Sequence, residues 1–302
     1  MVTAKLRQYA HDLRARAGKG ESLAVLRAAK EQMIKEIHRI VTIILGAPPT
    51  TFDCNNNNND EFDDDVTIYP YVSISHTIII IGQYLDKDKN YKTVTGLTPQ
   101  SFYLTHVAPH VNFAQTVSLI NDPRNTYNKH YTVQHLGNVW GGKAVSYVNV
   151  EIGQLKKYAI ASIKAGKAVW FGCDVGKFLD RKAGVMALDT FDYQLAFGTS
   201  FRELDKAGRL RFAESLMTHA MVFTGVHLES DGGLEKSVRW RVENSWGDEN
   251  GDKGYYSMTD AWFDEFMYQV VIDKSLVSPD LLKILEEKAI ELPPWDPMGS
   301  LA

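Results

Sequence analysis

A succession of short β-rich segments after residue 150 is the feature that most restricts how this chain can fold. A helix is predicted first, because apolar residues recur every three or four positions between residues 152 and 163 and Gly166 ends the pattern. Five runs with strand character follow, separated by turn residues: 167–173, 219–229, 237–244, 253–258 and 266–274. This order predicts an α+β fold for residues 151–275, in which one helix precedes an antiparallel, barrel-like sheet.

The first 52 residues are different, because they predict helix and little else. Residues 22–45 carry apolar side chains every three or four positions with basic residues between them, and Gly46 and Pro48 end the pattern. The first 44 residues contain nine Lys and Arg against four Asp and Glu. Such a basic helix is typical of a solvated face, and weak binding of an anionic partner such as nucleic acid is the alternative.

Residues 53–85 interrupt the chain with another composition. The run FDCNNNNNDEFDDD is too polar to bury a core, and a β-branched run follows it. We predict an insertion that is disordered at its start, and translated intron sequence is the alternative. Its apolar part, residues 66–81, is interrupted by Pro70 and His76 and is too short to span a membrane.

Two further segments connect or end the chain. Residues 86–150 mix short apolar runs with prolines and are interpreted as a connecting segment. Residues 276–302 begin with a short charged helix and end in LPPWDPMGSLA, which we expect to be extended because prolines dominate it.

Composition narrows the possible classes of function. With 33 Lys and Arg against 37 Asp and Glu, the net charge of −4 disfavours a dedicated nucleic-acid binder. The two cysteines and nine histidines form no spacing typical of a metal site, so we expect neither a metal nor a cofactor. Two cysteines make no disulfide framework, and no signal peptide is evident. These features predict a soluble cytoplasmic protein without a membrane segment.

Two polar residues stand at the ends of predicted strands. His219 opens the run 219–229, and Asn244 closes the run 237–244. If these strands are antiparallel neighbours, both residues meet at one edge of the sheet. A thiol peptidase needs this pair, because the imidazole takes the proton of a cysteine while the asparagine oxygen fixes the direction of the imidazole. Trp246, two positions later, can shield that hydrogen bond from water.

Several motifs resemble one group of peptidases. THAMVFTGV, WRVENSWG and GDKGYY, in that order, resemble the second half of the papain superfamily of cysteine peptidases. AVWFGCDVGK, ESLMTHAM and the terminal LPPWDPMGSLA are similar to the bleomycin hydrolase family, cytosolic aminopeptidases within that superfamily. The resemblance covers residues 1–52 and 86–302. It implies a papain-like fold, of which this chain holds the β-rich half and a helical N-terminal arm.

The resemblance also implies roles for four residues. His219 would be the catalytic base, Asn244 the residue that orients it, and Trp246 the shielding indole. Ala302 would end in the active-site cleft, where its free carboxylate pairs with the α-ammonium group of a peptide and blocks longer N-terminal extensions. The implied partners are peptides with a free N-terminus and further copies of the chain, assembled as a hexamer.

Neither cysteine of the sequence fits the nucleophile that the resemblance requires. The family carries it in a Gln…Cys-Trp context at the start of a long helix, which we expect upstream of Met1. Cys173 follows a buried strand and is expected to be structural, whereas Cys54 precedes five asparagines and lacks a helix start. We therefore expect a truncated or inactive form of a cysteine aminopeptidase. The alternative is a non-catalytic scaffold that binds peptides through the same fold.

Overall fold

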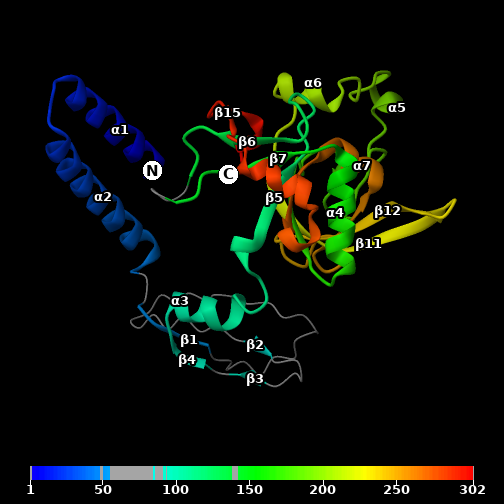
Figure 1. The fold of residues 1–302 in the computed structure, drawn as a ribbon, viewed down its shortest axis with the longest axis horizontal. Coiled ribbons are helices and arrows are strands. Elements are labelled where there is room, and N and C mark those ends of the chain that lie inside the picture. Colours follow the sequence, from blue (N-terminus) through cyan, green and yellow to red (C-terminus); the bar gives the residue numbers. More distant parts are fainter. Residues whose placement is uncertain are drawn as a thin grey trace. The chain divides into compact units, whose positions relative to one another are not determined.

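The described residues of the chain divide into two units. The computed structural model describes residues 2–47, 50–54, 84–85, 91–92, 94–137 and 142–301. Contacts group them into Met1–Val111 and Asn112–Ala302 (Figure 1). The predicted disorder at the start of 53–85 falls on positions outside the described residues, apart from the short strand that ends at Cys54. Among the described residues, no helix combines the length and hydropathy that crossing a bilayer requires.

A helical hairpin opens the first unit. α1 (Val2–Gly18) packs against α2 (Leu23–Leu45), and the Lys5 Nζ atom lies 3.0 Å from a carboxylate oxygen of Glu36. The Ser22 hydroxyl caps α2 by accepting a hydrogen bond from the Val25 backbone N–H. The helix predicted over 22–45 is therefore confirmed to within one residue.

Short elements complete the first unit. β1 (Phe52–Cys54) pairs antiparallel with β4 (Val94–Leu97), and β2 (Tyr84–Leu85) pairs with β3 (Tyr91–Lys92). The α3 helix (Pro99–Phe102) starts at a Thr98 capping box and continues into a π-helical turn, Tyr103–Val107.

A large mixed sheet forms the second unit. Among the described residues its strands lie in the order β15-β6-β7-β5-β14-β8-β11-β12-β13-β10-β9. Their bounds are β5 Thr116–Ile120, β6 Lys129–Val133, β7 Tyr147–Asn149, β8 Val169–Cys173, β9 Leu179–Asp180, β10 Val185–Met186, β11 His219–Asp231, β12 Leu234–Glu243, β13 Tyr255–Thr259, β14 Met267–Asp273 and β15 Ile290–Leu292. The helices of this unit are α4 (Ile152–Lys164), α5 (Tyr193–Phe197), α6 (Lys206–Arg211), α7 (Asp260–Phe266) and α8 (Pro279–Lys283).

The core of the second unit lies between helices and sheet. α4 packs on β8, β11 and β14 and buries Leu155 and Ala159 completely (Figure 1). Phe223 of β11 stacks on Phe171 of β8 with ring centroids 4.0 Å apart. Full burial of such a side chain contributes roughly 1.5–3 kcal/mol, so this layer holds the central strands in a fixed register. The helix predicted over residues 152–163 is confirmed as α4.

The sheet is broader than the five predicted runs. Each run contains a strand, β8, β11, β12, β13 or β14, and the pairings among these five are antiparallel. Three further strands, β5, β6 and β7, come from the segment interpreted as connecting. β5–β7, β6–β15 and β10–β13 pair in parallel, so the whole sheet is mixed rather than antiparallel. Short length and intervening prolines conceal these strands in the sequence.

The prediction of an extended C-terminal tail is wrong for part of its length. After β15, residues Pro297–Gly299 form a 3-10 turn. Pro297 fixes a φ that suits the first position of a helical turn, and the Asp296 side chain accepts a hydrogen bond from the Met298 N–H at 2.9 Å. The turn buries Met298 completely, and this burial outweighs the extended preference of the surrounding prolines.

Candidate active site

The ends of β11 and β12 bring His219 and Asn244 together. The two strands pair antiparallel, with Val222 opposite Glu243, so the first residue of β11 lies near the residue that follows β12. The His219 Nε2 atom is 2.8 Å from Asn244 Oδ1, and both residues are half-buried. The juxtaposition predicted from the two strand ends is therefore present.

A second hydrogen bond fixes which way the Asn244 amide points. The backbone N–H of Ser245 donates to Asn244 Oδ1 at 2.8 Å, so this atom must be the oxygen of the amide. An oxygen cannot donate, and Nε2 of His219 therefore carries the proton of their shared hydrogen bond. In the neutral imidazole the lone pair then lies on Nδ1, which leaves that atom as the proton acceptor.

Trp246 covers the pair from one side. Its ring stacks on the His219 imidazole with centroids 4.8 Å apart and planes inclined by 29°. The Arg181 guanidinium lies 4.7 Å from the Trp246 ring centroid, and the Tyr256 ring packs edge-on against the indole at 6.3 Å. The indole is held between these neighbours, so it can keep water from the histidine–asparagine hydrogen bond.

The turn before β13 explains the glycine of the GDKGYY motif. The Gly254 carbonyl accepts a hydrogen bond from the Asn244 backbone N–H at 3.2 Å. Gly254 has φ +85°, and a Cβ at this position would lie 3.2 Å from the Gly247 carbonyl oxygen. A residue with a side chain would strain this turn, and the backbone on both sides of Asn244 would shift.

Sequence reasoning did not find the polar cluster behind His219. Asp174 follows β8 directly and accepts hydrogen bonds from the hydroxyls of Ser215, at 2.8 Å, and Thr218, at 3.2 Å. Burial raises the pKa of the Asp174 carboxyl, although these hydroxyls oppose the shift. The Thr218 backbone N–H donates to the Cys173 carbonyl at 2.9 Å, which fixes the start of β11. The sequence feature that could have indicated this cluster is the position of Asp174, an acidic residue directly after the predicted apolar strand 167–173.

The structure describes one cysteine side chain near this site, and it is a poor nucleophile. Cys173 is paired in register with His219, but it is fully buried in the core. Burial, together with the charge of Asp174, raises the pKa of the Cys173 thiol well above its ordinary value. The structural role predicted for Cys173 fits this environment. The side chain of Cys54 lies outside the description.

The C-terminal segment ends beside the site. The Ser300 hydroxyl donates to the Met217 carbonyl at 2.5 Å, two residues before His219. Leu301 lies over Gly172, where a Cβ would be 3.2 Å from its Cδ1 atom. Gly172 is the register partner of Ala220, the second residue of β11. Ala302, to which the sequence assigns a substrate-binding carboxylate, is outside the described residues.

The arrangement is suited to proton transfer. His219 can accept a proton at Nδ1 while Asn244 holds Nε2 as a donor, and the indole of Trp246 lowers the access of water. Within the described part of the chain, no group of three or more His, Cys, Asp or Glu side chains is arranged to hold a metal ion.

Known proteins are similar to this chain in sequence and in fold. Residues 1–75 and 81–299 match the model of the Peptidase C1-like family. Human bleomycin hydrolase is 43% identical over 300 residues, which are 99% of this chain and 60% of the relative. Aminopeptidase C of Streptococcus thermophilus is 40% identical over 98% of this chain and 60% of its own length. The crystal structure of PepW from Lactobacillus rhamnosis HN001 superimposes with a TM-score of 0.82 at 41% identity, covering 98% of this chain and 60% of that one.

These matches decide the fold and the family. The chain spans about 60% of the length of the curated relatives it matches. The family match includes residues 53–75, so it extends into the segment that the sequence set apart as an insertion. The resemblance to bleomycin hydrolase and the α+β, papain-like fold predicted from the sequence are confirmed. This chain belongs to the Peptidase C1-like family.

Proposed function

We propose that this chain forms the histidine- and asparagine-bearing part of a cysteine aminopeptidase. The observation that carries the proposal is the hydrogen bond between His219 Nε2 and Asn244 Oδ1, together with the Ser245 N–H that fixes the amide. This geometry leaves Nδ1 as a general base of defined direction. The relatives named bleomycin hydrolase and aminopeptidase C support the choice of a peptidase.

In the proposed reaction, His219 transfers two protons, one in each half of the reaction. Nδ1 takes the proton of a cysteine thiol, and the thiolate attacks the carbonyl carbon of the scissile amide. The imidazolium then gives that proton to the departing amine, which leaves a thioester. Water attacks the thioester while Nδ1 accepts its proton, and the returning thiolate recovers this proton as the acid is released. Asn244 holds the ring in place throughout, and Trp246 shields the hydrogen bond between the two residues.

We place the nucleophilic thiol outside the residues that the structure describes. Cys173 is buried in the core with a raised thiol pKa, which opposes the thiolate that the reaction needs. The relatives are longer than this chain, which spans about 60% of them, and this supports a thiol carried by additional sequence.

The chain end supports cleavage from the amino end of a peptide. Ser300 and Leu301 bring the C-terminal segment to the start of β11, which supports the substrate-binding carboxylate that the resemblance implies for Ala302. A carboxylate there attracts the α-ammonium group of a peptide and obstructs longer N-terminal extensions. The proposed substrates are therefore peptides with a free N-terminus.

We also propose a cytoplasmic homohexamer, with the N-terminal helices at the contacts between copies. α2 presents apolar side chains that are largely exposed: Ile43 is 76% exposed and Leu45 is 73% exposed. Exposed apolar faces of this kind mark interaction surfaces. The basic residues of the same helices leave weak binding of nucleic acid as a secondary proposal.

The test is to isolate the native protein with an antibody to residues 279–302 and to measure its mass and its peptidase activity. We expect a species larger than the 34.0 kDa of this chain that releases N-terminal residues and is inactivated by thiol alkylation. Substitution His219→Ala, introduced at the native gene, should abolish the same activity. A 34.0 kDa species without peptidase activity would contradict the proposal and favour the non-catalytic, peptide-binding scaffold.

A further inference from the structure

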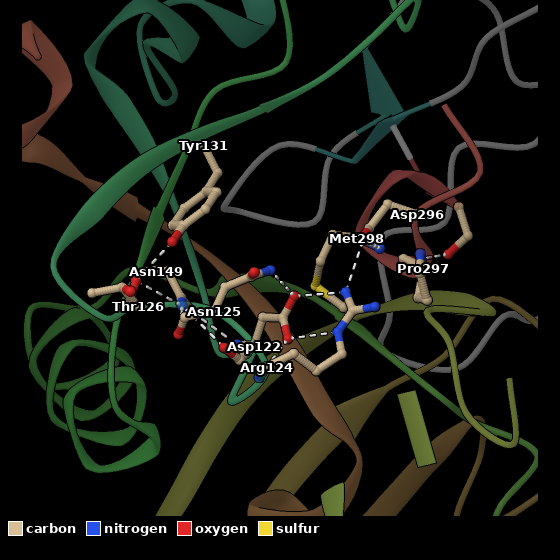
Figure 2. Close-up of polar contacts among 10 residues, drawn as sticks. Asp122, Arg124, Asn125, Thr126, Tyr131, Asn149, Asp296, Pro297 and Met298 are labelled. Carbon is tan, nitrogen blue, oxygen red and sulfur yellow. Dashed lines mark hydrogen bonds and ion pairs between the residues drawn. The ribbon is translucent and has the colours of Figure 1, made fainter. Parts of the chain in front are cut away.

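A buried ion network ties the C-terminal segment to the sheet. The Arg124 guanidinium donates to both carboxylate oxygens of Asp122, at 2.9 and 2.7 Å, and its Nη2 atom also donates to Asp296 Oδ1 at 2.9 Å (Figure 2). Asp122 follows β5, whereas Asp296 lies between β15 and the 3-10 turn at Pro297. One side chain therefore connects residues that are 172 positions apart in the chain.

Burial makes this connection strong. The side chain of Asp122 is fully buried, Asp296 is 8% exposed and Arg124 is 14% exposed. Burial alone would disfavour the guanidinium charge, but the two carboxylates outweigh it and raise the pKa of Arg124. Charge-assisted hydrogen bonds with this fork geometry are both directional and shielded from salt.

The residues after Asp296 run directly from this network to the candidate site. Asp296 caps the turn through the Met298 N–H, and Met298 is fully buried in an apolar cluster with Tyr131 and Tyr268. The Ser300 hydroxyl then reaches the Met217 carbonyl at the start of the His219 strand. Only three residues separate the Arg124 contact at Asp296 from this last anchor at Ser300.

We propose that Arg124 is a specificity-determining positioning residue, which fixes how far the C-terminal segment reaches toward His219 and thereby selects substrates by the length of their N-terminus. The inference rests on the proposed aminopeptidase function. Arg124 touches no substrate and acts through Asp296 and the turn that Asp296 caps. When the pair is broken, the turn loses its anchor, and Ser300 and Leu301 are no longer held at a fixed position beside the start of β11.

Two variants and a matched control separate this role from general stability. Asp296→Asn removes the charge but keeps an oxygen that can accept the Met298 N–H, and Arg124→Gln removes the partner. Lys129→Gln is the control, because Lys129 also binds the segment before β15, through Glu287 at 3.0 Å, but with both side chains nearly half-exposed. All three are made in the protein expressed from its own gene, and Asp296→Asn remains informative if Arg124→Gln fails to fold.

Two readouts are compared. Amide hydrogen exchange over residues 297–301 measures how firmly the C-terminal segment is held against the sheet. Hydrolysis of a dipeptide amide with a free α-amine, compared with hydrolysis of its N-acetylated form, measures how strongly the protein discriminates between the two N-termini. For Asp296→Asn we expect exchange to accelerate by at least about tenfold. The ratio of kcat/KM for the acetylated over the free peptide should rise by about the same factor. Lys129→Gln should change neither quantity.

Each other outcome overturns the inference at a different step. Unchanged exchange in both variants would show that Arg124 does not hold the segment. Faster exchange with an unchanged kcat/KM ratio would show that the position of the segment does not select substrates. If the unaltered protein cleaves neither peptide, the proposed function fails, and substrate selection by Arg124 fails with it. The exchange result would then still decide whether Arg124 anchors the segment.

Discussion

Two asparagines in the second unit are used in opposite ways. Asn149, at the end of β7, satisfies its side chain completely: Oδ1 accepts the Asp122 N–H, and Nδ2 donates to the carbonyls of Asp122 and Asn125. Asn244 uses only its oxygen, and its Nδ2 atom is buried without a hydrogen-bond partner among the described residues. Leaving a buried polar group unpaired costs about 1–3 kcal/mol, so the two residues contribute differently to stability.

The difference separates a structural region from a functional one. Around Asn149 and Arg124 each polar group supports another, which is how a buried network rigidifies a fold. Within the described part of the chain, Asn244 keeps an Nδ2 atom without a hydrogen-bond partner, and the neighbouring His219 keeps a nitrogen with a lone pair. Unsatisfied groups of this kind are expected where a site is poised for a reacting partner rather than closed for stability. The following substitutions test this distinction.

The largest effect is expected at His219. His219→Ala should lower kcat by about 10²- to 10⁴-fold if His219 is the general base, as proposed. The free energy of unfolding should change by less than about 1 kcal/mol, since the side chain is half-buried and the histidine does not support the core. Single-turnover kinetics and urea unfolding measure the two quantities. If the free energy of unfolding fell by as much as the activation free energy of the reaction rose, the distinction between the region around Asn149 and the region around Asn244 would be contradicted.

The opposite result is expected at Arg124. Arg124→Met should lower the free energy of unfolding by about 3–5 kcal/mol, because it leaves the fully buried carboxylate of Asp122 without its counter-charge. Lys129→Met breaks an exposed ion pair and should cost about 1 kcal/mol or less. Urea unfolding at pH 7 compares the two variants. Equal losses would mean that the Arg124 network is no stronger than a surface pair.

The two asparagines themselves give a smaller contrast. Asn149→Ala should cost about 1–3 kcal/mol, because the buried Asp122 N–H loses its acceptor and the Asp122 carbonyl keeps only the Asn125 N–H. Asn244→Ala should cost less than about 0.5 kcal/mol, because it also removes the unpaired Nδ2 atom. The same substitution should lower kcat, since the imidazole loses its orientation. Thermal unfolding and peptide hydrolysis, measured on both variants, would contradict this contrast if the order of the two effects were reversed.

The sequence predicted what depends on local patterns. Apolar periodicity identified α2 and α4, and the five β-rich runs each contain a strand of the sheet. His219 and Asn244 were found because each stands at the end of such a run, and the antiparallel register then brings them to 2.8 Å. Their catalytic roles stay a proposal that the substitutions above test.

Long-range contacts were out of reach of the same reasoning. Nothing near Arg124 in the sequence indicates that its second carboxylate is Asp296, because the pairing depends on β15 lying next to β6. β5 and β7, which pair in parallel, have only five and three residues, so any alternation within them is too brief to identify them. The C-terminal turn was missed because a side-chain cap and the burial of Met298 override the local preference of the prolines.

The smallest predicted effect concerns an exposed ion pair and its dependence on pH. Lys167, aided by Ser275, lowers the pKa of Asp273 to about 2 at the end of β14. An acid with a lowered pKa in the folded state stabilises the protein above its unfolded value, near 3.9, and loses this contribution as the pH falls toward 2. Because both side chains are accessible to water, the stabilisation at pH 7 should be below about 1 kcal/mol.

Asp273→Asn isolates this charge, because the amide oxygen can still accept the hydrogen bonds of Ser275. The variant should be less stable than the unaltered protein at pH 7, and the difference should shrink at pH 3, as measured by urea unfolding at both values. Asp280→Asn, in a pair whose Asp side chain is 93% exposed, is the control and should show no difference at either pH. A difference that stays constant between pH 7 and 3 would contradict the lowered pKa.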